Sequence, residues 1–321
     1  MWIGTRGSAL ALWQAHHVQR LLQERAGVQA ELEIIESSGD LNQVTRLSEL
    51  GVEGAFTREL EVALLDGRVD LAVHSHKDLP TDAPDGLVVA CVPGRGPVRD
   101  VLVIRPEAHD PDAPGLPLRR GARVGTGSAR RISQLRARRP DLVLEDLRGN
   151  VPTRLAKLAR THPGDWHYDA IVLAEAGLVR LELDPSPQLV VPLETSVLLP
   201  APAQGALALQ VRARDLTDPA AELPRALARI HCAETAACVA AERTVLAARP
   251  GGCNLPLGCR AHLTTDGVEL SAVLDVVGRG LVRARALAPD PVAAAHAVLD
   301  ILTRGDSETP RMASPTPEEH S

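Results

Sequence analysis

An internal repeat is the feature that most constrains how this chain can fold. Three short segments of the first 75 residues recur, in the same order, after residue 120. Each copy contains apolar runs of strand type, and the first of these leads through a glycine–serine loop to a helix start. Chance seldom preserves the order of three matches, so we infer two α/β lobes of similar plan. The matched pairs are residues 3–9 (IGTRGSA) and 124–129 (VGTGSA), the strands that lead to 39–40 and to 148–150, and residues 70–73 (DLAV) and 169–172 (DAIV).

The first copy of the last segment leads into polar residues that a plain turn does not need. Residues 71–73 form a short apolar run typical of a buried parallel strand, and the polar stretch after them ends at Pro80. The strand therefore delivers Ser75, Lys77 and Asp78 to its carboxyl end, where open α/β sheets bind their ligands. A carboxylate beside an ammonium group favours a functional site here over a solvated turn.

Both copies also offer groups that bind anions. Ser8 and Ser128 each precede a predicted helix, and free backbone N–H groups at a helix start can bind a carboxylate or phosphate. The second copy is rich in arginines at predicted loop or helix-start positions. Together with Arg6 they can form forks for several carboxylates, each charge-assisted contact contributing about 1.5–3 kcal/mol. These second-copy arginines are Arg130, Arg131, Arg148, Arg154 and Arg180.

Composition restricts the class of protein and of partner. A net charge of -6 and an aromatic content of 2% argue against a nucleic-acid binder, which needs cationic surface or stacking platforms. No apolar run is long enough to span a membrane and no basic, apolar leader is present, so we expect a soluble, cytoplasmic protein without membrane partners. The five cysteines are odd in number and form no Cys-x-x-Cys pair, which favours free thiols over disulfides or a structural zinc site.

From about Thr217 the pattern changes to helices followed by alternating strands, which predicts a separate small α+β domain. A predicted helix over 231–248 is stopped by the sequence RPGG and leads to Cys253. Small flanking residues leave its sulfur room, so Cys253 is the one cysteine whose surroundings suit attachment or attack. After a final predicted helix over 291–303 the chain becomes rich in Pro, Ser, Thr and Glu, which is typical of disorder.

These patterns divide the chain into four parts. The apolar strand after the sequence LPAPAQGA is expected to return to the first lobe, because two-lobed proteins commonly cross between their lobes more than once. The expected division is 1–95 with about 198–214 for the first lobe, 96–197 for the second lobe, 217–303 for the C-terminal domain and 304–321 for a disordered tail.

Longer motifs run along nearly the whole chain, to about residue 303. Several are long and their order is right, so the chain resembles the porphobilinogen deaminase family, also called the hydroxymethylbilane synthases. The motifs are GTR (4–6), ALWQAH (11–16), Phe56, ELE (59–61), AVHS (72–75) with Lys77 and Asp78, Arg130 with Arg131, LRGN (147–150) with Thr153 and Arg154, QGA (204–206), ETA (234–236) and GGC (251–253).

The resemblance implies a fold of the α/β class. Two similar α/β lobes would surround a cleft, as in type II periplasmic binding proteins, and a small C-terminal α+β domain would follow them. The implied enzyme is a transferase of tetrapyrrole and heme biosynthesis. It joins four porphobilinogen molecules head to tail, releases ammonia at each addition, and frees hydroxymethylbilane by hydrolysis.

The resemblance also implies a cofactor and roles for single residues. A dipyrromethane, assembled by the enzyme from its own substrate, would be joined to Cys253 by a thioether, and no metal is implied. Asp78 would be the catalytic carboxylate. The expected form is a monomer that can hand its product to the next enzyme of the pathway. The residues expected to hold acetate and propionate side chains are Arg6, Ser8, Ser75, Lys77, Thr126, Ser128, Arg130, Arg131, Arg148, Arg154 and Arg180.

Three departures from the family pattern concern substrate holding. Glu49 and Glu53 stand where members of the family often carry lysines, Ser38 where an arginine is common, and Gly127 where a serine is common. They leave open how much the stretch around residue 50 contributes to holding substrate.

Two other classes of protein explain part of the sequence. A non-enzymatic two-lobed binding or sensing protein for a small carboxylate explains the repeat but gives Cys253 no task. A metal hydrolase is suggested by His74, His76 and Asp78, which alternate onto one face of a strand, but no second histidine–acid cluster completes a ligand set.

Overall fold

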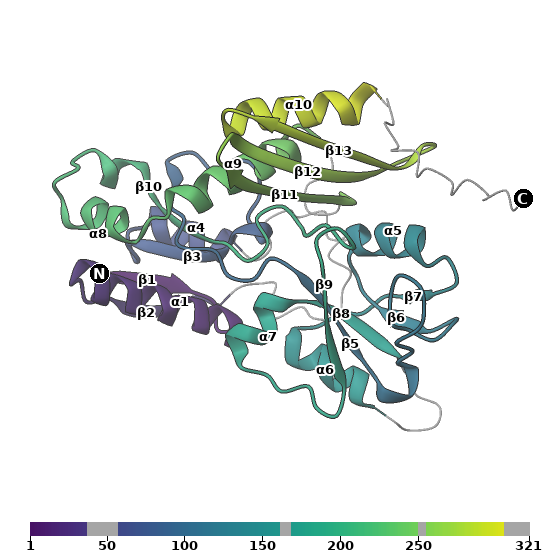
Figure 1. Ribbon diagram of the computed structural model, residues 1–321. Helices are drawn as coiled ribbons and strands as arrows, with labels where there is room; N and C mark the ends of the chain where they lie inside the picture. Colours follow the sequence, from purple (N-terminus) through teal and green to yellow (C-terminus); the bar gives the residue numbers. More distant parts are fainter. Residues whose placement is uncertain (37–56, 161–167, 250–254, 305–321) are drawn as a thin grey trace, which may run out of the picture.

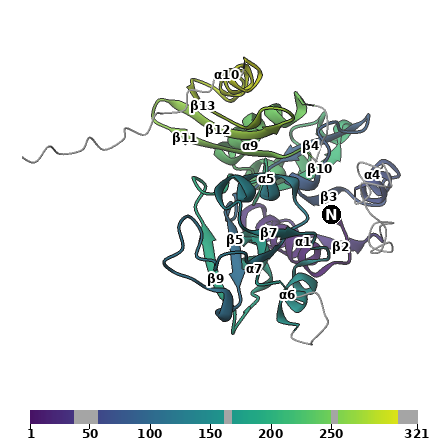
Figure 2. The same cartoon turned by 90° about the vertical axis from the view of Figure 1, so that its right-hand side faces the viewer.

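The computed structural model describes residues 1–36, 57–160, 168–249 and 255–304, which form three β-sheets with helices packed on them. Two sheets have five strands each and the third has three. In Figure 1 and Figure 2 the three-stranded sheet lies above the two lobes, with α10 (Pro291–Arg304) on its outer side. The expectations about Ser38, Glu49, Glu53 and Cys253 fall outside the described residues.

The first lobe is built on the strand order β2-β1-β3-β10-β4. β1 pairs in parallel with β2 and β3, whereas β10 is antiparallel to both of its neighbours. The apolar face of α1 packs on this sheet, and the π-helical turn after it ends at Gly27, whose φ of 69° favours glycine. The elements are β1 (Trp2–Thr5), α1 (Ala9–Leu21), β2 (Glu31–Ile34), α4 (Arg58–Leu65), β3 (Leu71–Ser75), β4 (Leu87–Cys91) and β10 (Leu207–Arg212).

The second lobe repeats this plan with the order β7-β6-β8-β5-β9. β6 pairs in parallel with β7 and β8, and β5 is antiparallel to β8 and β9. Its elements are β5 (Asp100–Ile104), β6 (Arg123–Gly125), α5 (Ala129–Arg138), β7 (Val143–Glu145), α6 (Val151–Ala159), β8 (Ala170–Ala174), α7 (Glu175–Leu181) and β9 (Leu189–Leu193). The two similar α/β lobes predicted from the repeat are confirmed.

The chain crosses between the lobes twice, through residues 92–99 and 194–206, and the two crossovers touch. Gly96 N donates to Gly205 O at 3.0 Å. The buried carboxylate of Glu242 joins both crossovers, because it accepts from Arg95 at 2.8 Å and from Ala203 N at 2.7 Å. Glu242 lies in α9 (Ala233–Ala247), so the C-terminal domain is anchored where the lobes meet.

The C-terminal domain is an antiparallel meander covered by α9 and α10, which share one apolar core with it. Its strands are β11 (Leu257–Thr264), β12 (Gly267–Val276) and β13 (Gly280–Ala288). α8 (Glu222–Ile230) instead buries Ala226, Leu227 and Ile230 in the first-lobe core. The last helix includes Arg304, which contacts Asp300 one turn earlier, where a cation suits the carboxyl end of a helix.

Candidate active site

The end of β3 presents Asp78 on a short turn. β3 is buried from Leu71 to His74, and residues 76–78 then form a single 3₁₀ turn. Asp78 is exposed at the end of this turn, and Lys77 is half-buried beside it. The buried strand therefore carries Asp78 to the carboxyl end of the first-lobe sheet, which is the position predicted from the sequence.

A guanidinium from the C-terminal domain fixes this turn. Arg243 in α9 donates to the carbonyl oxygens of His76 at 3.1 Å, of Leu79 at 3.0 Å and of Pro80. Three carbonyl groups held by one cation leave the backbone around Asp78 little freedom. Sequence reasoning missed Arg243, because an arginine on a helix is usually solvated and carries no motif of its own.

Arg130 and Arg131 begin α5 but point into the protein, with 4% and 5% of their surface exposed. Both pair with the buried carboxylate of Asp100, at 2.7 Å each. Burial alone would raise the pKa of Asp100, but the two guanidinium groups outweigh it and hold that pKa well below its ordinary value. Asp100 was also missed from sequence, since an aspartate at the head of an apolar run has no distinctive pattern.

This cluster holds more positive than negative charge. One carboxylate serves two guanidinium groups, and the Nε atoms of Arg130 and Arg131 are buried without a hydrogen-bond partner among the described residues. Lys77 belongs to the same cluster: burial lowers the pKa of Lys77, Asp78 and Asp100 raise it, and the two arginines lower it. An excess of cations with unfilled donors suits an anionic ligand.

Arg154 extends the cationic region in the second lobe. Burial lowers the pKa of Arg154, Arg131 lowers it further, and Asp146 and Asp78 oppose them. Asp78 of the first lobe thus acts on a guanidinium of the second, so the two lobes meet at this site. Arg148 is more exposed and pairs with Asp146 at 2.7 Å.

Arg180 in α7 lies between the lobes. Its guanidinium carbon is 5.6 Å from the ring centre of Trp13 in α1, and its Nη2 donates to Gly205 O at 2.6 Å. Trp13 stacks in turn on His17, with ring centres 5.1 Å apart. Burial lowers the pKa of Arg180 to about 10. These contacts join the lobes, and carboxylate binding by Arg180 stays a prediction.

The serines that precede α1 and α5 differ in whether the hydroxyl group caps the helix. Ser8 Oγ accepts from Ala11 N at 3.3 Å and caps α1, whereas the side chain of Ser128 makes no cap hydrogen bond to α5. Thr126 is buried, and its Oγ1 accepts from Ser128 N at 3.3 Å. Ser8 therefore serves the fold of its own helix, while the hydroxyl of Ser128 does not.

Ser75 and Arg6 lie at the carboxyl ends of the neighbouring strands β3 and β1. The buried Gln14 of α1 donates to Ser75 Oγ at 2.8 Å, which orients that hydroxyl. Arg6 is half-buried, and its charge contributes to lowering the pKa of His74. The structure thus brings Arg6, Ser75, Lys77 and Asp78 to one edge of the first-lobe sheet.

A metal hydrolase is suggested because His74, His76 and Asp78 are predicted to share one face of a strand. That prediction is wrong, because β3 ends at Ser75 and residues 76–78 form a 3₁₀ turn. Burial lowers the pKa of His74 to about 4, and its Nε2 lies 3.0 Å from Gln210 Oε1. Burial, helped by Arg243, lowers the pKa of His76 to about 3. Within the described ranges, no three His, Cys, Asp or Glu side chains are grouped so as to hold a metal ion.

The four cysteines that the structure describes are free thiols. Burial raises the pKa of Cys91 to about 12, and it also raises the pKa of Cys238 and of Cys259. Cys232 is half-buried just before α9. Burial and a raised pKa both oppose reaction at a thiol, so three of the four are poor candidates for attachment.

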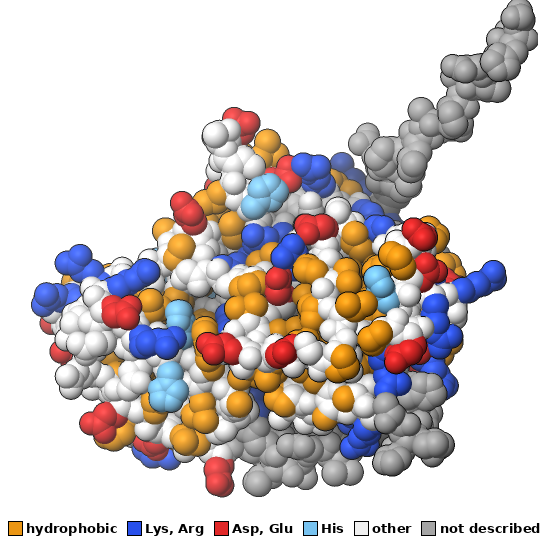
Figure 3. Space-filling model, turned by 60° about the horizontal axis from the view of Figure 1, so that its bottom comes forward, with side chains coloured by type: hydrophobic (Ala, Val, Ile, Leu, Met, Phe, Trp, Pro, Cys, Tyr) orange, Lys and Arg blue, Asp and Glu red, His pale blue; other side chains and the backbone are white. Residues whose placement is uncertain are grey.

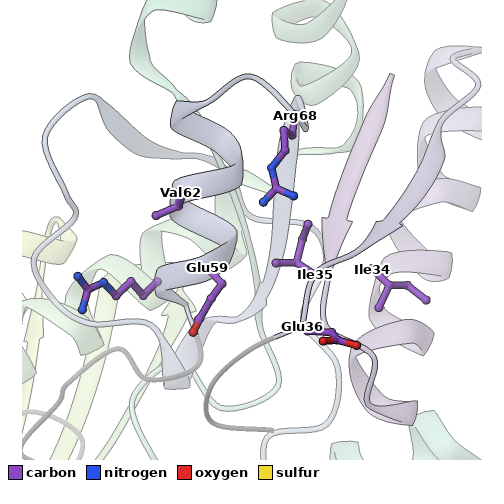
Figure 4. Close-up of a pocket in the computed structure, with 7 residues that line it drawn as sticks. Ile34, Ile35, Glu36, Glu59, Val62 and Arg68 are labelled. Carbon is purple, nitrogen blue, oxygen red and sulfur yellow. The ribbon is translucent and has the colours of Figure 1, made fainter. Parts of the chain in front are cut away.

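The rest of the surface offers mixed chemistry. Figure 3 shows cationic and anionic side chains interspersed with apolar ones on one face. A cavity of about 480 Å³ opens between the end of β2 and α4 (Figure 4) and holds none of the predicted site residues. It is lined by Ile34, Ile35, Glu36, Arg58, Glu59, Val62 and Arg68. None of the helices in the described ranges is both long and apolar enough to span a membrane.

Comparison with known proteins gives one consistent result at the level of sequence. A family model described as porphobilinogen deaminase, dipyromethane cofactor binding domain, matches residues 1–218. The porphobilinogen deaminase of Maridesulfovibrio salexigens is 42% identical over 290 residues, which cover 89% of this chain and 88% of that protein. The porphobilinogen deaminase of Micrococcus luteus is 41% identical over 321 residues, covering 91% and 83%.

Similarity to solved structures is more distant. A periplasmic substrate-binding protein of an ABC transporter from Coxiella burnetii aligns with a TM-score of 0.39 and 15% identity, covering 76% of this chain and 96% of that one. A nutrient-binding protein from Burkholderia cenocepacia bound to methionine aligns with a TM-score of 0.40 and 14% identity, covering 72% and 90%. Likenesses this weak say nothing about the ligand of this chain.

Proposed function

This chain belongs to the porphobilinogen deaminase family, and on that premise we propose that Asp78 is its catalytic carboxylate, facing a cluster of cations that binds pyrrole carboxylates. The protein is a transferase of tetrapyrrole biosynthesis that uses a dipyrromethane cofactor. It joins four porphobilinogen molecules head to tail, releases ammonia at each addition and hydrolyses the chain to hydroxymethylbilane. The excess of cations around Lys77, next to Asp78, is the observation that supports this site most strongly.

The cluster has the donors that a dipyrromethane needs. Arg130 and Arg131 each keep a buried Nε without a partner among the described residues, and Asp100 balances only one of their two charges. Acetate and propionate groups would complete that balance through charge-assisted hydrogen bonds. When bound, the dipyrromethane supplies the pyrrole carbon to which the first substrate is joined.

Asp78 can stabilise the cation that the reaction produces. Loss of ammonia from the aminomethyl group of porphobilinogen leaves positive charge on the substrate. A carboxylate about 4 Å from that charge contributes about 4 kcal/mol at an effective dielectric constant near 20. The same carboxylate can accept a pyrrole N–H bond and take up the proton that is released when the new bond forms.

The other predicted residues would divide the binding of carboxylates between the lobes. Arg6, Ser75 and Lys77 belong to the first lobe, and the remaining set to the second; Ser8, also expected to bind carboxylates, uses its hydroxyl to cap α1. Each ring of the growing chain carries two carboxylates, so several cations are needed as the chain lengthens. The second-lobe set is Thr126, Ser128, Arg130, Arg131, Arg148, Arg154 and Arg180.

Cys253 is our candidate for the thioether to the cofactor. It lies outside the described residues, so its support comes from the GGC motif and from the other cysteines. Cys91, Cys238 and Cys259 are buried, and the pKa of each thiol is raised. A buried thiol of raised pKa seldom forms the thiolate that attacks a carbon atom.

We also propose a division into lobes at 1–95 with 198–214 and at 96–197. The C-terminal domain expected over 217–303 is corrected at both ends: α8 packs in the first-lobe core, so the domain begins with α9, and α10 continues to Arg304, so the tail expected from residue 304 can begin only after it. The protein would act as a monomer in the cytoplasm and pass its product to the next enzyme. Free thiols at all four described cysteines agree with a reducing compartment. Size-exclusion chromatography with light scattering measures the oligomeric state, and a dimer would contradict this proposal.

Intact-mass spectrometry tests the function and the attachment site together. The purified protein should carry an adduct about as heavy as two pyrrole rings, and Cys253→Ser should lack it. Cys232→Ser is the matched control, because Cys232 is the least buried of the four described thiols, and it should keep the adduct. An adduct on Cys238 or Cys259 would overturn the site, and a protein that forms no hydroxymethylbilane from porphobilinogen would overturn the function.

A further inference from the structure

Gln204 lies in a turn with a constrained backbone. The residues on either side of it have left-handed conformations, with φ of 61° at Ala203 and 85° at Gly205. A Cβ at Gly205 would lie 2.7 Å from the carbonyl oxygen of Gly96, so only glycine fits there. The backbone N–H of Ala203 donates to the carboxylate of Glu242, which fixes the position of this residue. A strained turn fixed by its surroundings is typical of positions with a function.

The side chain of Gln204 is buried and bonds at both ends. Its Nε2 donates to Asp100 Oδ1 at 3.0 Å and to Val98 O at 2.8 Å, and its Oε1 accepts from Lys77 Nζ at 3.4 Å. An ionised carboxylate and a carbonyl group only accept, whereas an ammonium group only donates. The reversed amide would lose all three bonds, so the neighbours of Gln204 determine its orientation.

We propose that Gln204 is a positioning residue that holds the Lys77 ammonium beside Asp78 and at a fixed position relative to the cluster of Asp100, Arg130 and Arg131. This inference rests on the proposed function and deepens it. The contacts run from Lys77 through Gln204 to Asp100, and from there to Arg130 and Arg131. They join the turn of the first lobe to the cations of the second through one neutral side chain from the crossover.

A neutral acceptor has a defined effect on a buried ammonium group. The charged groups that act on Lys77 are Asp78 on its own turn, Asp100 in β5, and Arg130 and Arg131 in α5. The carbonyl oxygen of Gln204 favours the protonated form of Lys77 without adding a charge to the cluster. Removing this acceptor should make Lys77 lose its proton at lower pH, and replacing it with a carboxylate should have the opposite effect.

The chain makes this measurement simple, because lysine occurs only at positions 77 and 157. Protein labelled with ¹³C at lysine Cε should give two side-chain NMR signals, which Lys157→Arg assigns. The titration midpoint of Lys77 should fall in Gln204→Met, which has similar length but no carbonyl acceptor, and rise in Gln204→Glu. The matched control is Gln210→Met, which removes a buried glutamine that bonds His74 and should leave Lys77 unmoved.

Opposite shifts in the two Gln204 variants, with none in the control, support the inference. Shifts of the same sign, or none, overturn it, and if Gln204→Met does not fold, the sign in Gln204→Glu decides. This titration needs no turnover, so a parent protein that forms no product would contradict the proposed function separately.

Steady-state kinetics give the second readout. In active protein, Gln204→Met should lower kcat about tenfold, as expected for one lost hydrogen bond to a charged group. It should also move the alkaline limb of the pH profile to lower pH, because Lys77 becomes neutral earlier. Unchanged kcat with an unmoved limb would overturn the role of Gln204 in the reaction.

Discussion

The two lobes share a strand order but end their equivalent strands differently. After β3 the first lobe makes a 3₁₀ turn that leaves Asp78 exposed, and Arg243 holds the carbonyl groups of His76 and Leu79 on either side of it. After β8 the second lobe enters α7 directly, and its acid there, Glu175, pairs with Arg99 at 3.0 Å. The topology therefore fixes where a side chain emerges, and the few residues after the strand decide whether an acid is available or neutralised.

The available acid lies in the first lobe, whereas most of the cationic side chains lie in the second. The first lobe contributes Arg6 and Lys77, whereas the second collects Arg130, Arg131 and Arg154 near one another. A duplicated plan has thus become an acid-bearing lobe and a cation-bearing lobe. The acid of one lobe and the cations of the other lie close together where the lobes meet. This arrangement suits a substrate that is anionic at its edges and cationic at its reacting carbon.

The sharpest way to break this comparison is to neutralise the acid of each lobe in turn. Asp78→Asn keeps the size and one acceptor oxygen but loses the charge, so kcat should fall about a thousandfold, since 1.36 kcal/mol is tenfold and about 4 kcal/mol is removed. The effect should appear in kcat, because the cation forms only after binding. Steady-state kinetics on protein shown by mass to carry its cofactor measure this.

Glu175→Gln is the matched control, and its kcat should stay within about twofold of the parent. A kcat of Asp78→Asn within about tenfold of the parent would remove Asp78 from the centre of the mechanism. An equal loss in both variants would mean that the lobes are not specialised.

Removal of a buried cation should give the next largest effect. Arg131→Ala leaves Asp100 with Arg130 alone, so the free energy of unfolding should fall by about 3 kcal/mol, and cofactor assembly should be impaired. Arg304→Ala removes an exposed pair with Asp300 and should change stability by less than about 0.5 kcal/mol. Urea denaturation and intact mass measure the two effects, and equal outcomes would contradict the role of the second-lobe cluster.

The pH dependence of stability tests the ion pairs of Asp100 with the second-lobe arginines. The pKa of Asp100 is depressed in the folded protein, so its contribution is complete above its unfolded value near pH 4 and is lost as pH falls through its folded value. Asp100→Asn should therefore be less stable than the parent by about 3 kcal/mol at pH 7. The difference should narrow below about pH 4, as urea denaturation over pH 3–7 can show. A constant difference would mean that Asp100 does not titrate as its ion pairs require.

The two helix starts offer a smaller test. Ser8→Ala removes the cap of α1 and should cost about 1 kcal/mol of stability with little effect on KM. Ser128→Ala removes no cap and should leave stability unchanged while raising KM for porphobilinogen a few fold. Thermal unfolding and initial rates measure both, and the reverse pattern would interchange the roles given to the two serines.

The smallest effect is expected from Glu49 and Glu53. An anion cannot hold an anionic substrate, so replacing both with Lys should lower KM for porphobilinogen or leave it unchanged, with kcat unaffected. Initial-rate kinetics on the double variant measure this. A large loss of kcat would show that these glutamates act in the chemistry itself.

The repeat and the strand ends could be predicted because they depend on local patterns. The period of apolar residues marks strands, and the polar break after residues 71–73 marks the position of Asp78. Asp100, Arg243 and Gln204 could not be given their contacts from sequence. Each acts through partners far along the chain, such as Arg130 for Asp100 and Pro80 for Arg243, and only the folded topology brings these together.

The strand order also affects when each lobe can be completed during synthesis. β10 lies between β3 and β4, so the first-lobe sheet waits for residue 212, whereas the second-lobe sheet needs only residues 100–193. The ribosome makes the first lobe first, yet the second should close its sheet earlier. Limited proteolysis of a fragment ending at residue 198 should therefore spare 100–193 and cut before residue 92. The strand that leads to Asp78, β3, would gain its second neighbour, β10, only after the sheet of the cation-bearing lobe is complete.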